Sequence, residues 1–322
     1  MKSRLICTLI LIAATQVAAT QLAVADAPLL VGVLESLPRA DPVESARPRV
    51  RVVFRHAAAG WEALPHDCPD VECLTTLPAQ YPPRVRWTVS LAGLTLGTIS
   101  ARTPADFSAY ASIGLQDIVS RGAVPTVGKQ ATEYAGFLNE PRYRPLLVTS
   151  GRQRPIRSSA GWKPGVPDPE DLDRVWPVFK HLIPRIDNCE LPAGPSEEGA
   201  PTPPLWRGPK RLDLEIPVAW VARNGDALLR VMVREEVFKE CDAPRTLPSQ
   251  LWLLRRANGQ IRTLPGQLEL DRAELVMPLE FDDLLRDGKD EILFMTAGYN
   301  QGGYVLYYEG FRKFVKYSWQ YH

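Results

Sequence analysis

Short segments of alternating apolar and polar residues, separated by turn residues, run along most of the chain. In residues 49–56 (RVRVVFRH) the alternation has the period of two that is typical of a half-buried strand. Asn224-Gly225, which lies between two apolar segments, is the strongest short hairpin signal. The strands expected from these patterns are 49–56 returning as 61–64, 85–91 returning as 94–100, 146–148, 213–223 returning as 227–233, 251–255 returning as 260–264, 291–296 returning as 304–308, and 314–321.

Helical periodicity is scarce by comparison. One short helix is expected to begin at Asp168, with Pro169 in its first position and Glu170 in its first turn, where a carboxylate suits the helix dipole. We expect it to end near Pro177, because proline lacks the amide hydrogen that continues a helix. Residues 105–118 carry apolar side chains at helical spacing but are interrupted by a glycine, so the pattern does not decide between a helix and a strand.

These elements predict an all-β protein with one short helix. The composition agrees, because the 322 residues include 30 prolines, too many for a protein of long helices. Short strands bounded by turns are typical of sandwiches, barrels and propellers, and a β-propeller or propeller-like assembly of short antiparallel strands is the leading expectation. Residues 191–210 contain nine prolines and glycines, which indicates a surface loop or a boundary between two β-domains, the alternative architecture.

The first 25 residues have the three-part layout of a secretory signal peptide. Two basic residues precede an apolar run at 5–14, and Ala23-Val24-Ala25 offers the small side chains that a signal peptidase requires. The apolar run is shorter than the roughly 20 residues of a membrane-spanning helix, so a membrane anchor is the less favoured interpretation. The mature chain is therefore expected to comprise residues 26–322, to be secreted or periplasmic, and to have no transmembrane segment after signal removal.

Four of the five cysteines lie in the mature chain: Cys68, Cys73, Cys189 and Cys241. An even number in an oxidising compartment predicts two disulfides, for which three pairings are possible. The favoured pairing is Cys68–Cys73 and Cys189–Cys241. His66 with Cys68 and Cys73 offers an alternative metal site, but zinc sites need a second pair of ligands, and none follows at suitable spacing.

The formal net charge is +1, and it becomes −1 when the two basic residues of the signal segment are removed. A chain with so little net charge has no long-range field, so a nucleic-acid partner is not expected.

Residues 281–294 (FDDLLRDGKDEILF) resemble the FG-GAP repeat of integrin-type β-propellers, in which an acidic loop precedes an apolar strand. The resemblance extends through the next hairpin to residue 308. The positions that match the repeat are Asp283, Asp287, Gly288 and Glu291.

In intact repeats of this family the loop binds calcium through several oxygen ligands. Here Leu285 stands where a second acid or amide is expected, and Arg286 adds a positive charge beside the loop. The resemblance therefore implies a degenerate calcium-type loop, formed by Asp283, Asp287 and Glu291, that keeps its turn shape without a metal.

Aromatic residues are concentrated near the C-terminus, with ten of 27 lying between residues 294 and 322. One face of the last expected strand carries Val315, Tyr317, Trp319 and Tyr321. This face predicts either a platform for a sugar or peptide, or a core strand, which is the favoured interpretation. The better ligand candidates lie on or beside the turn at 298–303, because loops carry binding residues. They are Tyr299, Asn300, Gln301 and Tyr304.

The sequence contains no recognisable catalytic constellation. Gly-x-Ser-x-Gly, Gly-x-x-x-x-Gly-Lys and His-Glu-x-x-His motifs are all absent, and no cofactor is expected. The four histidines and the acidic cluster at 168–173 are assigned surface, capping and helix-dipole roles. The sequence thus favours an exported, non-enzymatic binding or envelope-associated protein whose partner is an unknown protein or glycan. The alternative is a hydrolase acting on cell-wall or extracellular polysaccharide, for which a pair of facing carboxylates would be needed.

Overall fold

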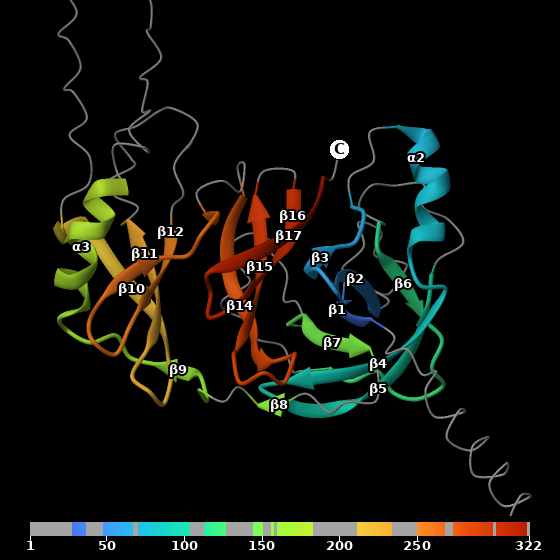
Figure 1. Ribbon diagram of the computed structural model, residues 1–322, viewed down its shortest axis with the longest axis horizontal. Coiled ribbons are helices and arrows are strands. Elements are labelled where there is room, and N and C mark those ends of the chain that lie inside the picture. Colours follow the sequence, from blue (N-terminus) through green and yellow to red (C-terminus); the bar gives the residue numbers. More distant parts are fainter. Residues whose placement is uncertain are drawn as a thin grey trace, which may run out of the picture.

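The computed structural model describes residues 28–36, 48–66, 70–103, 113–126, 144–150, 156–157, 160–182, 211–233, 250–267, 273–298 and 301–320. These residues form three antiparallel sheets that lie side by side, with one longer helix covering the last sheet (Figure 1). The predicted signal peptide and the proline- and glycine-rich segment 191–210 lie outside the described residues.

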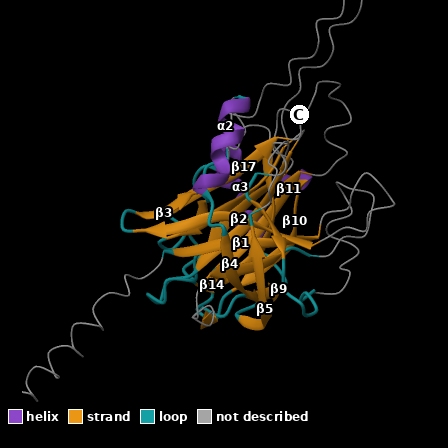
Figure 2. Cartoon of the chain, turned by 90° about the vertical axis from the view of Figure 1, so that its right-hand side faces the viewer, coloured by secondary structure: helices purple, strands orange, loops and turns teal. Residues whose placement is uncertain are grey.

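Six strands of the N-terminal half close into a ring, called here the closed sheet. In ring order they are β1 (Leu29–Ser36), β7 (Leu146–Ser150), β4 (Arg84–Leu91), β5 (Leu94–Arg102), β6 (Leu115–Ile118) and β2 (Pro48–Ala57). The pairing of β1 with β2 along the whole length of β1 closes the ring. β3 (Gly60–Ala63) pairs with the second half of β2 as a hairpin. Figure 2 faces this sheet.

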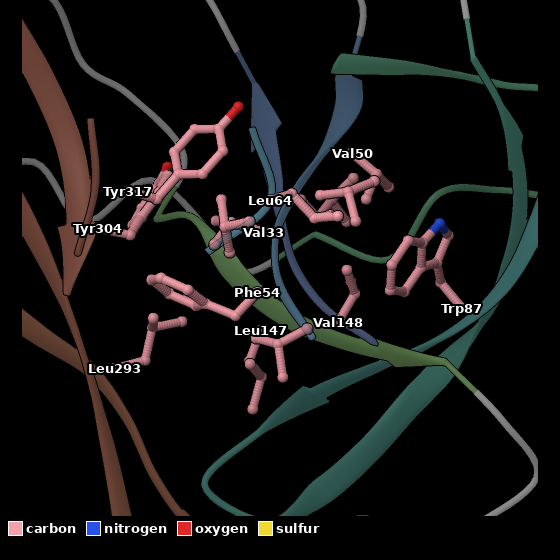
Figure 3. Close-up of a cluster of buried hydrophobic side chains, with 14 of the residues drawn as sticks. Val33, Val50, Phe54, Leu64, Trp87, Leu147, Val148, Leu293, Tyr304 and Tyr317 are labelled. Atoms are coloured by element: carbon pink, nitrogen blue, oxygen red, sulfur yellow. The ribbon is translucent and has the colours of Figure 1, made fainter. Parts of the chain in front are cut away.

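The inside of the ring is filled by apolar side chains, among them Val50, Trp87 and Val148, which are each fully buried (Figure 3). The Trp87 Nε1 donates to Gln116 Oε1 at 3.0 Å, so the one polar atom of this buried indole side chain has a hydrogen-bond partner. Gly32 allows the strands to approach closely, because a Cβ there would lie 2.8 Å from the Arg51 carbonyl oxygen. Close packing of this kind leaves the ring as a core rather than a channel.

The second sheet, called the middle sheet, is buried on both faces. Its strands in order are β17 (Lys313–Gln320), β16 (Gln301–Tyr308), β15 (Glu291–Gly298), β14 (Ala273–Asp283) and β8 (Ile156–Arg157). Leu293, Tyr304 and Tyr317 face the outside of the closed sheet, where Phe54 lies among them (Figure 3). Alternate residues such as Phe294 and Tyr307 face the third sheet.

The third sheet, called the outer sheet, consists of β13 (Ile261–Thr263), β12 (Gln250–Arg255), β11 (Ala227–Val233), β10 (Leu214–Val221) and β9 (Lys163–Gly165). Trp252 packs edge-on against Phe294 of the middle sheet at 5.3 Å between ring centroids. The other face of the outer sheet is covered by α3 (Asp171–Leu182) through Val175 and Phe179. Shorter helical turns are α2 (Val71–Thr76), η1 (Leu77–Gln80) and η4 (Arg211–Asp213).

The prediction that α3 ends near Pro177 is wrong, because the helix continues to Leu182 with Pro177 inside it. An internal proline removes one helix hydrogen bond and clashes with the preceding turn. The helix continues because Phe179, close after the proline, is 3% exposed against the outer sheet. Burial of that ring offsets the local cost of the proline.

The prediction of an all-β fold is confirmed, whereas a propeller is not. Face-to-face stacking of a closed sheet on two open sheets replaces the expected radial blades (Figure 1). In segment 105–118, for which the sequence did not decide between helix and strand, residues 115–118 form β6. Gly114, directly before this strand, has φ +74°. Within the described part of the chain, no helix combines the length and apolarity needed to cross a membrane.

Candidate functional site

The acidic loop that resembles an FG-GAP repeat connects β14 to β15 and closes on itself. The Asp283 carboxylate accepts hydrogen bonds from the backbone amides of Asp287 and Gly288, each at 3.0 Å. Gly288 has φ +82°, a conformation that favours glycine. Glu291 Oε2 accepts from the Leu284 amide at 2.8 Å. The three predicted ligand residues thus lie close together around one loop, with Asp283 at the end of β14, Asp287 in the loop and Glu291 at the start of β15.

These carboxylates are arranged as turn caps rather than as a coordination sphere. Calcium takes six to eight oxygen ligands, whereas both oxygens of Asp283 are directed at amide hydrogens. Asp287, the most exposed of the three, accepts a hydrogen bond from the Lys289 amide at 2.9 Å and forms an ion pair with the Lys289 ammonium group at 3.3 Å. Among the residues described, no three His, Cys, Asp or Glu side chains are grouped to hold a metal ion. The donor set does not fit calcium, and we derive no chemistry through it.

A group of buried carboxylates adjoins this loop, and two of its three members, Glu280 and Asp282, were missed in the sequence. Glu280, Asp282 and Glu291 are 6%, 2% and 2% exposed. Glu280 and Asp282 are two residues apart on β14, and Asp282 lies directly opposite Glu291 on β15. Their i, i+2 spacing on a strand is the one signal in the sequence that places two of these acids on the same face.

Burial raises the pKa of all three acids, and the charges of nearby acids raise it further for Asp282 and Glu291. Loss of solvation, followed by the charges of Glu280, Asp290 and other nearby acids, raises the pKa of Asp282 to about 9. Loss of solvation is also the main cause that raises the pKa of Glu291 to about 8. Both carboxylate oxygens of Asp282 are buried without a hydrogen-bond partner. Glu280 accepts from the Ala92 amide at 2.8 Å, and burial raises its pKa as well.

The predicted ligand residues near the turn at 298–303 do not form an open site. Tyr299 and Asn300 lie outside the described residues, and Gln301 begins β16 with a half-buried side chain. Tyr304 is only 2% exposed and faces the closed sheet. A ligand role for Tyr304 is therefore corrected to a core role, because its side chain points between two sheets rather than into solvent.

Tyr304 belongs to a buried polar network between the closed and middle sheets. Its hydroxyl donates to Glu35 Oε1 at 2.7 Å, and Arg51 donates to both Glu35 oxygens from Nε (2.8 Å) and Nη2 (3.2 Å). The Arg51 guanidinium also lies 4.0 Å from the centre of a Trp319 ring. Glu35 and Arg51 are 4% and 1% exposed, so the ion pair is fully desolvated.

The aromatic face of β17 completes this network. The Tyr317 hydroxyl donates to the Ile113 carbonyl at 3.1 Å and lies 3.1 Å from the Tyr81 hydroxyl. His66 packs on the Tyr317 ring with its centroid 4.8 Å away. The favoured interpretation of this strand as a core strand is borne out for Tyr317 and Trp319, which are 0% and 8% exposed. Tyr321, on the same expected face, lies outside the described residues.

A hollow of about 240 Å³ lies at the end of the closed sheet beside Glu35. Its lining residues are Leu34, Glu35, Pro48, Pro125, Thr126, Arg144 and Leu146. Among the described residues that line it, Glu35 is the single carboxylate, and both of its oxygens already bind Arg51.

Acidic residues at the starts of α3 and α2 have structural roles. Asp171 at the start of α3 is fully buried, accepts from the Asp168 amide at 2.9 Å, and lies 3.3 Å from both Arg174 and Arg255. Asp70 caps α2 by accepting from the Cys73 amide at 2.8 Å.

The predicted disulfide pairing stays a prediction. Cys73 is disulfide-bonded, but Cys68, Cys189 and Cys241 lie outside the described residues, so its partner is not identified.

No family model, no curated protein and no solved structure matches this chain. A functional assignment therefore rests on the arrangement of its own side chains.

Proposed function

We propose that the mature chain is an exported, non-enzymatic binding protein that recognises a protein or glycan outside the cytoplasm. The observation that carries the proposal is that its candidate functional carboxylates are already bonded to other groups within the protein. Asp283 and Glu291 cap their own loop, and Glu35 is held by Arg51 and Tyr304. Polar contacts to a partner would then come from exposed strand faces.

The alternative of a polysaccharide hydrolase receives less support. Glycoside hydrolysis uses two carboxyl groups that flank the scissile bond. The hollow beside Glu35 offers one carboxylate, and that one is neutralised by an arginine. The acids of β14 and β15 are buried, and Glu280 among them accepts a hydrogen bond from the Ala92 amide instead of facing a cleft.

The experiment compares binding with hydrolysis on the same material. Purified residues 26–322 would be co-sedimented with isolated cell envelopes of the organism that encodes the chain, with heat-denatured protein as the control. We expect saturable binding by the folded protein and no increase in reducing ends. Binding equal to that of the denatured control would overturn the proposal, and release of reducing ends above the blank would favour the hydrolase.

A further inference from the structure

Two arginines lie directly opposite each other on the exposed face of the β4–β5 hairpin. Arg84 begins β4 and is paired in register with Arg102 at the end of β5. Arg86, two residues along β4, shares their face because side chains alternate along a strand. All three are exposed, while the intervening Val85 and the following Trp87 are buried inside the ring. This set of three is called the arginine face.

The arginine face has no partner in the protein itself. In the described part of the chain, none of its three guanidinium groups makes a hydrogen bond or an ion pair. Asp117 on β6 lies opposite Arg102, but its carboxylate is bound by Arg49 at 3.3 Å. Like charges directly opposite each other on a sheet are destabilising. A bound anion would relieve that repulsion.

The arginine face lies at the end of the hairpin that is away from the middle sheet. The tip of the hairpin is held against the middle sheet, where the Ala92 amide donates to Glu280. The arginines occupy the other end, at the start of β4 and the end of β5. The exposed leucines of the hairpin, Leu94 and Leu96, lie near the tip and do not flank the arginines.

The geometry points to an acidic polysaccharide as the partner of the arginine face, an inference that rests on the proposed function and names its ligand class. A guanidinium group binds a carboxylate through two parallel hydrogen bonds. Neighbouring positions on one sheet face are about 5 Å apart across strands and about 7 Å apart along a strand. Regularly repeated acidic groups of a polymer can engage several such positions at once, whereas a single exposed pair contributes little.

A membrane surface fits less well, because interfacial binding combines basic residues with adjacent apolar side chains. The leucines that could serve in this way lie at the opposite end of the hairpin. Anionic vesicles are therefore the comparison in the test.

The test uses the whole mature chain and polygalacturonate as the acidic probe, with neutral dextran beside it. The variant R84Q/R86Q/R102Q removes three charges from the arginine face. The matched control K163Q/K180Q/K316Q removes three charges from β9, α3 and β17. We expect the wild type to bind polygalacturonate with an affinity that falls as salt increases. The arginine variant should lose about tenfold or more, and the lysine control should stay within about twofold of the wild type.

A third variant, R84K/R86K/R102K, keeps the charges but removes the planar groups, and we expect a partial loss of affinity. It also keeps the test valid if the glutamine variant unfolds, since it retains the native charge at each position. Equal binding by the wild type and the glutamine variant would overturn the inference. Arginine-dependent binding to vesicles of phosphatidylcholine and phosphatidylglycerol, with no binding to polygalacturonate, would also overturn it. Binding to envelopes without binding to polygalacturonate would reject this ligand class and leave the proposed function standing.

Discussion

Asp282 and Glu291 lie directly opposite each other across β14 and β15, and both carboxyl groups are buried. Two acids in this arrangement cannot both ionise without loss of solvation and mutual repulsion. The folded protein therefore holds protons that the unfolded chain releases at neutral pH.

Replacement of Asp282 by asparagine is expected to stabilise the protein at neutral pH. Its pKa is about 9 in the folded state against 3.8 in the unfolded reference, so keeping it protonated at pH 7 costs free energy. Removing this titration should raise the free energy of unfolding by about 1–3 kcal/mol, after allowance for a buried amide. Chemical denaturation at pH 7 measures the change.

The matched control for this variant is the neighbouring carboxylate. Asp283→Asn weakens the acceptor of two backbone amides and should destabilise by about 1–2 kcal/mol. Stabilisation by both variants, or by neither, would contradict the difference in environment between the two carboxyl groups.

The wild-type protein is expected to be more stable in mild acid than in mild base. Acids with raised pKa values contribute stability that is complete below the unfolded values, near pH 4, and is lost as the pH rises through the folded values. For Glu291 and Asp282 these folded values are about 8 and about 9. The free energy of unfolding should therefore fall steadily between about pH 5 and pH 9 in denaturation curves. A profile that is flat or rises over this range would be inconsistent, and Asp282→Asn should make it shallower.

Tyr304→Phe is expected to cost more stability than Tyr307→Phe, although both residues lie on β16. The Tyr304 hydroxyl donates to the buried Glu35 carboxylate, whereas the Tyr307 hydroxyl donates to the neutral Pro265 carbonyl at 3.0 Å. Hydrogen bonds to charged groups contribute about 2 kcal/mol and neutral ones about 1 kcal/mol. Parallel denaturation curves measure the two losses, and equal losses would show that the Glu35–Arg51 pair does not depend on Tyr304.

Gly114→Ala is expected to destabilise the contact between the closed sheet and β17 by about 3 kcal/mol. The residue has φ +74°, and an added Cβ would lie 2.4 Å from the Tyr317 hydroxyl oxygen and 2.9 Å from the Val52 carbonyl oxygen. Thermal unfolding measures the loss.

Gly310→Ala is the control for backbone strain alone, because φ is +66° there and no atom lies within 4 Å of the new Cβ. It should cost about 1–2 kcal/mol. The double variant Gly114→Ala/Tyr317→Phe should lose less than the sum of its single changes, since the clashing oxygen is removed. Strict additivity would argue against the predicted clash.

Hairpins with clear alternation and glycine turns could be predicted from the sequence, as β4–β5 and β10–β11 show. β1 and β14 could not. β1 is apolar on both faces because one lines the ring and the other meets the middle sheet. The alternation of β14 is interrupted by two register shifts, at Leu275/Met277 and at Pro278/Glu280.

The candidate site was predicted in part, for a related reason. The spacing of Asp283, Asp287 and Glu291 placed them correctly around one loop, within it or at the ends of the strands that flank it. Alternation alone does not say which face of a strand a second sheet will cover, so neither the burial of Asp282 nor that of Tyr304 could be predicted. Both depend on contacts made by segments far apart in the sequence.

The hydrogen bond from Tyr304 to Glu35 joins residues 269 positions apart, near the two ends of the chain. A structure dominated by such distant contacts folds slowly, because long loops must close before the contacts form. For the export route that residues 1–25 predict, β1 would emerge from the translocation channel first. It would stay unpacked until β16 and β17 had also been translocated. The protein would then acquire its native structure only after release on the far side of the membrane. A folding chaperone in that compartment would meet the chain with β1 and β2 still unprotected.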